Sequence, residues 1–104
     1  MNNKNEILTI LLNMRNKLEN CKPGTMPSID IIHGLCWLLD RQCSMYTCLY
    51  SEIMELILKY NPKNSVYNAY WFPTLGRLPV TQKDIDMCIT PRLTIINNVI
   101  KDLK

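Results

Sequence analysis

The chain has 104 residues, 47% of them hydrophobic and 20% charged, so we expect one domain over residues 1–104 with a single small core. The 12 lysines and arginines against 9 acidic residues give a net charge of only +3, and no two basic residues are adjacent. Nucleic-acid binders usually carry a basic patch, so a nucleic-acid partner is not expected. No segment approaches the roughly 18–20 apolar residues of a membrane span, so a membrane partner is not expected either.

Residues 1–20 alternate aliphatic and polar side chains and lack the apolar run and cleavage site of a signal peptide. The five cysteines are an odd number, which favours free thiols in a reducing compartment. We therefore expect a soluble protein of the cytoplasm.

The first helix is predicted over residues 4–19. Asn3 is a suitable N-cap, and Glu6 follows three positions later in the arrangement of a capping box. Apolar residues recur at helical spacing along one face. They are Ile7, Leu8, Leu11, Met14 and Leu18. The turn residues of 21–24 end this helix.

Two further helices are predicted, over residues 28–42 and 45–60. Ser28 suits the N-cap of the first of them. Gly34 in its interior costs about 1 kcal/mol relative to alanine, and indicates either a close helix crossing or a split into two shorter pieces. The other helix stops before Pro62.

Residues 61–89 form a long irregular connection that carries four of the eight aromatic residues, with a short helical turn expected at 84–88. The last helix is predicted to begin at Thr90 as N-cap and Pro91 as the first helical residue. The fold class is therefore mainly α: a small four-helix assembly with an aromatic and proline-rich loop between the third and last helices.

The strongest candidate for a binding site is this aromatic loop together with nearby arginines. Rings can stack on a flat ligand, and guanidinium groups pair with carboxylate or phosphate through parallel hydrogen bonds. The expected ligand-binding residues are Tyr70, Trp71, Phe72, Arg77 and Arg92. The alternative is that the rings close one end of the helix bundle as part of its core.

A zinc site would need four of the ligands that zinc prefers, and His33, Cys36, Cys43 and Cys48 are the candidates. Their spacing lacks the paired C-x2-C units of zinc proteins, so no metal or other cofactor is expected. His33 is also the sole histidine, and no catalytic signature surrounds it or Cys36. We therefore do not expect the protein to be an enzyme.

Two pairs of carboxylates have the close spacing that two-carboxylate chemistry or a divalent cation requires. One is Glu52 with Glu55, and the other is Asp84 with Asp86. Both pairs fall where solvent-facing charge is expected, and we interpret them as solvated surface. Glu55 is also expected to pair with Lys59 one helical turn away.

The layout resembles a group of short proteins encoded by bacteriophages, mostly without an assigned activity. The pieces that carry the resemblance are Gly34-Leu35-Cys36, Tyr70-Trp71-Phe72-Pro73 and Arg92-Leu93-Thr94-Ile95-Ile96. The resemblance covers most of the chain, but residues 64–84 have no residue-by-residue counterpart in the group, so no binding site is carried over from it.

Phage origin implies a small non-enzymatic protein of the host cytoplasm that acts against bacterial defence. The first hypothesis is that it sequesters a nucleotide-like signalling ligand in the aromatic loop. The second is that it binds and inhibits a host defence protein, and the third is a structural or assembly role. In each case a homo-oligomer is expected, since a chain this short gains from burying further apolar surface.

Overall fold

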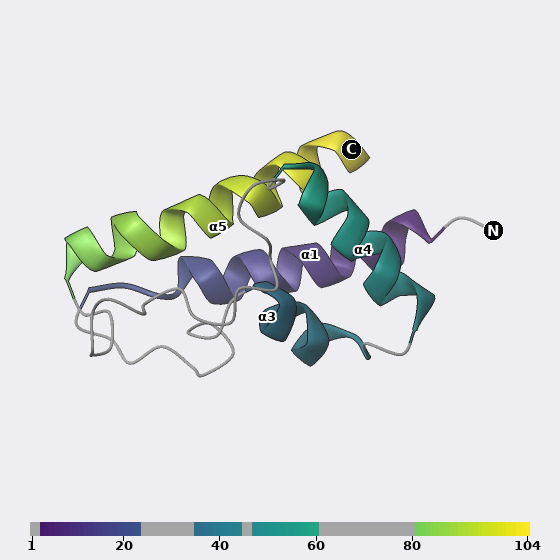
Figure 1. Ribbon diagram of the computed structural model, residues 1–104, viewed down its shortest axis with the longest axis horizontal. Coiled ribbons are helices and arrows are strands. Elements are labelled where there is room, and N and C mark those ends of the chain that lie inside the picture. The colour runs from purple at the N-terminus through teal and green to yellow at the C-terminus, as the bar shows by residue number, and fades with distance from the viewer. Residues whose placement is uncertain (1–2, 24–34, 45–46, 61–80) are drawn as a thin grey trace.

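The computed structural model describes residues 3–23, 35–44, 47–60 and 81–104, and these residues form a mainly α fold. Its helices are α1 (Lys4–Glu19), α3 (Leu35–Gln42), α4 (Cys48–Lys59) and α5 (Gln82–Leu103), as Figure 1 shows. The fold class predicted from the sequence is confirmed. The predicted aromatic loop, residues 61–80, lies outside the described residues.

Helix α1 has the bounds predicted for it. Ile7, Leu11, Met14 and Leu18 are buried, as their spacing indicates. The expected side-chain cap is wrong, because Asn3 makes no side-chain hydrogen bond to the helix. Its backbone (φ −90°, ψ 9°) is not in the extended conformation typical of a capping residue, and its carbonyl instead accepts the first helical bond, from the Ile7 amide at 2.9 Å.

Helix α4 begins at Cys48 rather than at Met45. The reason is Thr47, whose backbone is extended (φ −97°, ψ 155°) and whose hydroxyl accepts a hydrogen bond from the Tyr50 amide at 3.4 Å. This is the geometry of an N-cap residue, so the first helical residue is Cys48, directly after Thr47. Helix α3 ends at Gln42 as predicted, while its expected start at Ser28 lies outside the described residues.

Helix α5 is longer than predicted, and Thr90 is not its N-cap. The helix begins at Gln82 and continues through Pro91, so the turn expected at 84–88 is part of it. The Thr94 hydroxyl donates a hydrogen bond to the Thr90 carbonyl at 3.0 Å within the helix. Proline favours the first helical turn but is also found inside a helix where packing offsets the lost backbone bond. Here Ile89, two residues before the proline, is fully buried.

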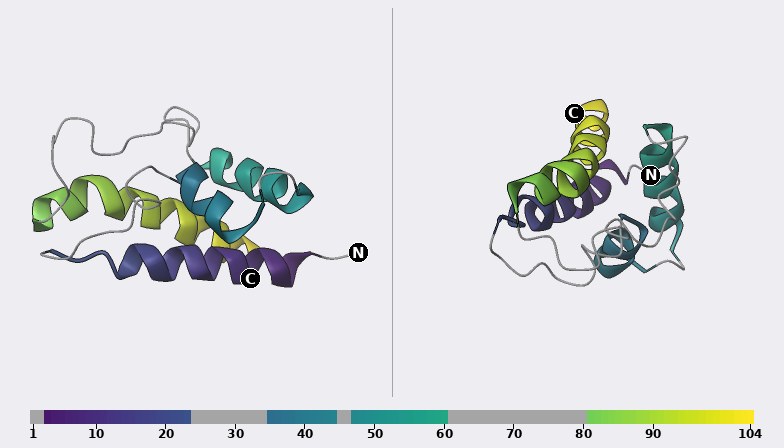
Figure 2. Two further views of the ribbon diagram at one scale, coloured as in Figure 1. Left: turned by 90° about the horizontal axis from the view of Figure 1, so that it is seen from below. Right: turned by 60° about the vertical axis from the view of Figure 1, so that its left-hand side comes forward.

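The helices pack as an antiparallel pair with two shorter helices against one side of it. Helices α1 and α5 lie side by side and run in opposite directions, and α3 and α4 lie next to each other on the same side of this pair (Figures 1 and 2). The molecule is elongated, measuring 44 × 22 × 21 Å. The antiparallel arrangement brings the start of α1 and the end of α5 to the same end of the molecule, beside α4 (Figure 1).

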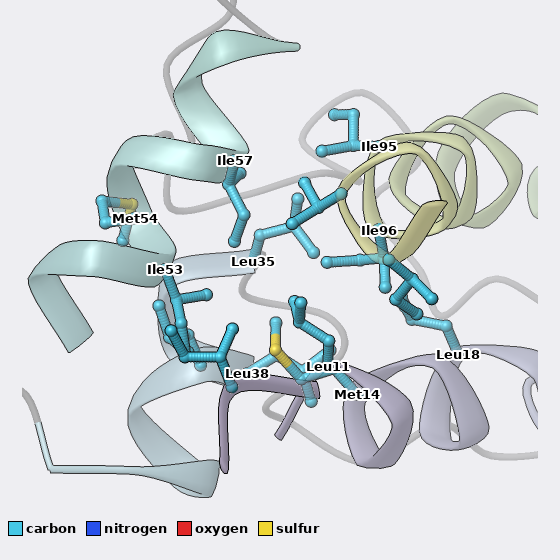
Figure 3. Close-up of a cluster of buried hydrophobic side chains, with 14 of the residues drawn as sticks. Leu11, Met14, Leu18, Leu35, Leu38, Ile53, Met54, Ile57, Ile95 and Ile96 are labelled. Atoms are coloured by element: carbon cyan, nitrogen blue, oxygen red, sulfur yellow. The ribbon is translucent and has the colours of Figure 1, made fainter. Parts of the chain in front are cut away.

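The core lies where the four described helices converge. Figure 3 shows side chains from each helix meeting there, including Leu11, Met14, Leu18, Leu35, Leu38, Ile53, Ile57 and Ile96. Each of these residues has 1% or less of its surface exposed. Burial of this apolar surface is the main favourable term in folding. No helix in the described part of the chain is long and apolar enough to cross a membrane.

Candidate functional site: a groove at one end of the helix bundle

Four of the five residues expected to bind a ligand lie outside the described residues. They are Tyr70, Trp71, Phe72 and Arg77. The fifth, Arg92, is on α5, and only 1% of its surface is exposed. The structure therefore neither assembles nor excludes the predicted aromatic pocket, and that pocket stays a prediction.

Arg92 is a buried cation in an otherwise apolar region of the helix bundle. Its positive charge acts on the thiols of Cys21 and Cys36, whose pKa values burial raises and Arg92 lowers by a smaller amount. The side chain takes part in a polar interaction, although its Nε and Nη2 atoms have no hydrogen-bond partner in the described part of the chain. A ligand would meet this guanidinium only inside the helix packing and not on an open surface.

The structure instead shows an open groove of about 520 Å³ where α1 begins and α5 ends. We call it the terminal groove. It is lined by Asn3, Lys4, Ile7, Glu52, Glu55, Leu56 and Leu103. These residues come from α1, α4 and α5 or, for Asn3, from the residue preceding α1, so the groove exists because three helices meet at this end of the molecule (Figure 1).

The walls of the groove follow from the amphipathic pattern of α4. Ile53 and Ile57 point to the core and are fully buried, which turns Glu52 and Glu55 outward. The two glutamates are three residues apart and lie on neighbouring turns of the same helix face. Both are exposed, while Leu56 beside them is half-buried.

The floor of the groove is apolar. Ile7 of α1 is 5% exposed, and Leu56 and Leu103 are half-buried against the core. Lys4, in the first turn of α1, also lines the groove, and this lysine has an interaction of its own. The groove thus combines an aliphatic floor with two carboxylates from α4 and one ammonium group from α1.

A polar cluster next to the groove joins α4 to α5. The Tyr60 hydroxyl donates a hydrogen bond to Oδ2 of Asp102, and Lys59 Nζ lies 3.7 Å from the same oxygen. Lys59 Nζ also lies 5.9 Å from the centre of the Tyr60 ring. The predicted pair of Glu55 with Lys59 is therefore replaced by a contact between helices.

We call Glu52 and Glu55 the acidic wall of the groove. Because Lys59 pairs with Asp102, it does not balance the negative charge of this wall. Neither Glu52 nor Glu55 has an ion pair or a side-chain hydrogen bond among the residues that the structure describes. The two carboxylates stand next to each other on one helix, whereas two-carboxylate catalysis places them on either side of a reacting bond. The arrangement is suited to binding a cationic group above an apolar surface.

Part of the other candidate chemistry lies outside the described residues. His33 lies outside the described residues, as do the side chains of Asp84 and Cys88. Asp86 accepts a hydrogen bond from Gln82 Nε2 at 2.8 Å on the exposed side of α5. Within the described ranges no three histidine, cysteine or acidic side chains gather as metal ligands.

Comparison of the chain with protein-family models, with curated proteins and with solved structures finds no match. The terminal groove therefore has to be interpreted from its own residues.

Sequence reasoning identified Glu52 and Glu55 as a pair but assigned them to solvated surface. It did not connect them with Ile7 or Leu103, which are far away in the chain. The missing information was the antiparallel packing of α1 and α5, which brings the two ends of the described chain beside α4.

Proposed function

We propose that this protein acts by stoichiometric binding to a host protein, as a counter-defence factor of phage type. The observation that carries this proposal is the terminal groove, in which an apolar floor lies beside two carboxylates without ion pairs in the described chain. Apolar anchors flanked by polar and charged positions are the usual composition of protein-binding surfaces. The phage assignment is supported by the sequence resemblance alone.

The acidic wall favours a protein over a nucleotide as the occupant of this groove. Glu52 and Glu55 would repel a phosphate, and the single lysine among the lining residues does not reverse the balance of charge. Arg92, one of the residues expected to hold a phosphate, lies inside the helix packing and not in the groove.

Sequestration of a nucleotide-like ligand is the second candidate, and the burial of Arg92 is the observation that favours it. A guanidinium in a water-poor environment interacts strongly with an anion. Nucleotide sequestration requires a pocket that is formed by residues 70–77 together with Arg92. Because Arg92 does not line the terminal groove, this binding site would be a different one.

Affinity capture from a bacterial lysate separates the two candidates. The bait is the wild-type chain, and the test variant carries Glu52→Gln together with Glu55→Gln. The control carries Glu19→Gln together with Asp86→Asn, which removes the same charge from exposed positions on α1 and α5 outside the groove. We expect wild type and control to retain one host protein in a 1:1 complex by native mass spectrometry, and the test variant to lose it.

A thermal-shift screen against cyclic nucleotides and related second messengers provides the opposing outcome. A ligand at 100 times its dissociation constant stabilises a protein by about 2.7 kcal/mol. The proposal would be contradicted if a nucleotide stabilises wild type by this amount but does not stabilise Trp71→Ala, and if the capture experiment retains no host protein. These two results together would support nucleotide sequestration. Retention of virion components alone would support an assembly role.

A further inference from the structure

We infer that the terminal groove recognises a basic amphipathic helix of the partner protein, with an aliphatic residue as anchor and arginine or lysine on the neighbouring turns. This inference rests on the proposed function and adds the chemical class of its partner. It is carried by the shape of the groove, by the spacing of its carboxylates and by the charge that neighbouring residues leave uncompensated.

The apolar floor defines the anchor. Ile7, Leu56 and Leu103 come from three helices and surround an open volume of about 520 Å³. This volume lies in the range of sites that enclose small ligands, so it accommodates one or two side chains and not a whole domain. Anchor residues of this kind often dominate the energetics of a protein interface.

The acidic wall defines the charge of the partner. Glu52 and Glu55 project from neighbouring turns of α4, about 4.5 Å apart along the helix axis. Basic residues three or four positions apart on a partner helix have the same axial spacing, so the two rows match when the helices lie alongside each other. Arginine suits these positions best, because its guanidinium pairs with a carboxylate through two parallel hydrogen bonds.

The surrounding charges support a basic partner. The chain has a net charge of +3, so an acidic wall is a local exception. The nearest basic residue along α4, Lys59, pairs with Asp102 of α5 and is held next to Tyr60.

The test uses a synthetic peptide of about 16 residues, because shorter isolated helices are marginal in water. It has an alanine-rich background with one leucine and with arginines one and two turns away, and it carries a fluorophore for anisotropy measurements. We expect saturable binding to the full chain. The variant with Glu52→Gln and Glu55→Gln should bind about two- to thirtyfold more weakly, as expected for the loss of two exposed ion pairs.

Three controls make the result specific. The variant with Glu19→Gln and Asp86→Asn should bind like wild type, because it loses equal charge outside the groove. A peptide with glutamate in place of each arginine should not bind. Leu103→Asn, at a half-buried position in the last turn of α5, should weaken binding through the apolar floor and leave the helical circular dichroism unchanged.

Absence of saturable binding to wild type, or equal binding by the Glu52 and Glu55 double variant, would overturn the inference. If the peptide fails while a host protein is still captured in a 1:1 complex, the inference is wrong and the proposed function stands. If neither the peptide nor a host protein binds, the proposed function fails as well.

Discussion

Arg92 lies among core side chains although the sequence suggested it as a ligand-binding residue. It is 1% exposed on α5, and the residues at helical spacing from it, Ile89, Ile96 and Val99, are fully buried. This spacing was visible in the sequence. The prediction placed Arg92 in the first turn of a helix beginning at Pro91, where free backbone amides favour anions, whereas the helix begins at Gln82.

Substitution of Arg92 tests whether its side chain is part of the core. We expect Arg92→Ala to lower the free energy of unfolding by about 3 kcal/mol, because it leaves a cavity and removes a buried polar interaction. Arg92→Met fills most of the same volume and should recover about 2 kcal/mol of this loss. Urea denaturation followed by circular dichroism measures both values.

Arg41→Ala serves as the control, since Arg41 is exposed at the end of α3. It should change stability by less than about 0.5 kcal/mol. If Arg92→Ala is equally harmless, Arg92 is not packed as described. If Arg92→Met keeps full stability but removes nucleotide binding, the second candidate function gains direct support.

Tyr60 and Asp102 make stability depend on pH in the alkaline range. The hydrogen bond to the Asp102 carboxylate raises the pKa of Tyr60 above the ordinary tyrosine value of about 10. A raised pKa in the folded state means that the bond stabilises the protein below the unfolded-state pKa, and that this contribution is lost as pH rises through the folded-state pKa. Denaturation midpoints of wild type should therefore fall more steeply above about pH 10 than those of Tyr60→Phe.

Absorbance at 295 nm provides an independent measurement of the same titration. The difference between wild type and Tyr60→Phe should show one tyrosine that ionises at higher pH than the others. A difference curve centred on the ordinary tyrosine pKa, with parallel stability profiles for the two proteins, would show that the bond to Asp102 is not formed in solution.

At the scale of the helices, local sequence signals predicted the existence of the described elements better than their ends. The apolar spacing of Ile7, Leu11, Met14 and Leu18 was sufficient to predict α1 with its observed bounds. The start of α4 depends on the extended backbone of Thr47, and the start of α5 depends on packing around Ile89 that offsets an internal proline. These are tertiary and conformational effects, which residue spacing alone does not reveal.

Pro91 is expected to destabilise α5. It lacks the amide hydrogen that would bond to the carbonyl of residue 87, and proline in a helix interior costs about 3 kcal/mol relative to alanine. Its side chain is exposed, so substitution removes little packing. Part of the gain is offset because alanine leaves the unfolded chain more flexible. We expect Pro91→Ala to raise the free energy of unfolding by about 1–2 kcal/mol in urea denaturation.

Thr94→Ala provides a comparison at a second exposed position of the same helix. It removes a hydroxyl that bonds to the Thr90 carbonyl and should change stability by less than about 0.5 kcal/mol. A loss of stability in Pro91→Ala would show that proline at this position is needed for the packing of α5 against α1.

At the scale of the whole molecule, the candidate site comes from the way the helices assemble. The terminal groove joins residues 3–7 with residues 52–56 and Leu103, segments that no local pattern relates to one another. The resemblance to phage proteins did not point to it either. Among the described residues of the pieces that carry the resemblance, Leu35, Arg92 and Ile96 are core residues with 1% exposure or less, whereas Thr94 is exposed. These three core residues therefore take part in helix packing and not in a binding surface.

The expected homo-oligomer also belongs to this scale. The proposed occupant of the terminal groove is a basic partner helix and not a second copy of the chain. Self-association, if light scattering detects it, is therefore expected to leave peptide binding at Glu52 and Glu55 unchanged.

Hydrogen–deuterium exchange on the complex with the captured host protein tests the central claim, that the partner occupies the terminal groove. The first amides of a helix lack an internal hydrogen-bond partner and exchange rapidly, so residues 4–6 are sensitive reporters of a bound partner. We predict slower exchange at residues 4–7 and 52–56 in the complex than in the free protein. Protection confined to residues 61–80, with exchange around the groove unchanged, would contradict the account and return the binding site to the aromatic loop.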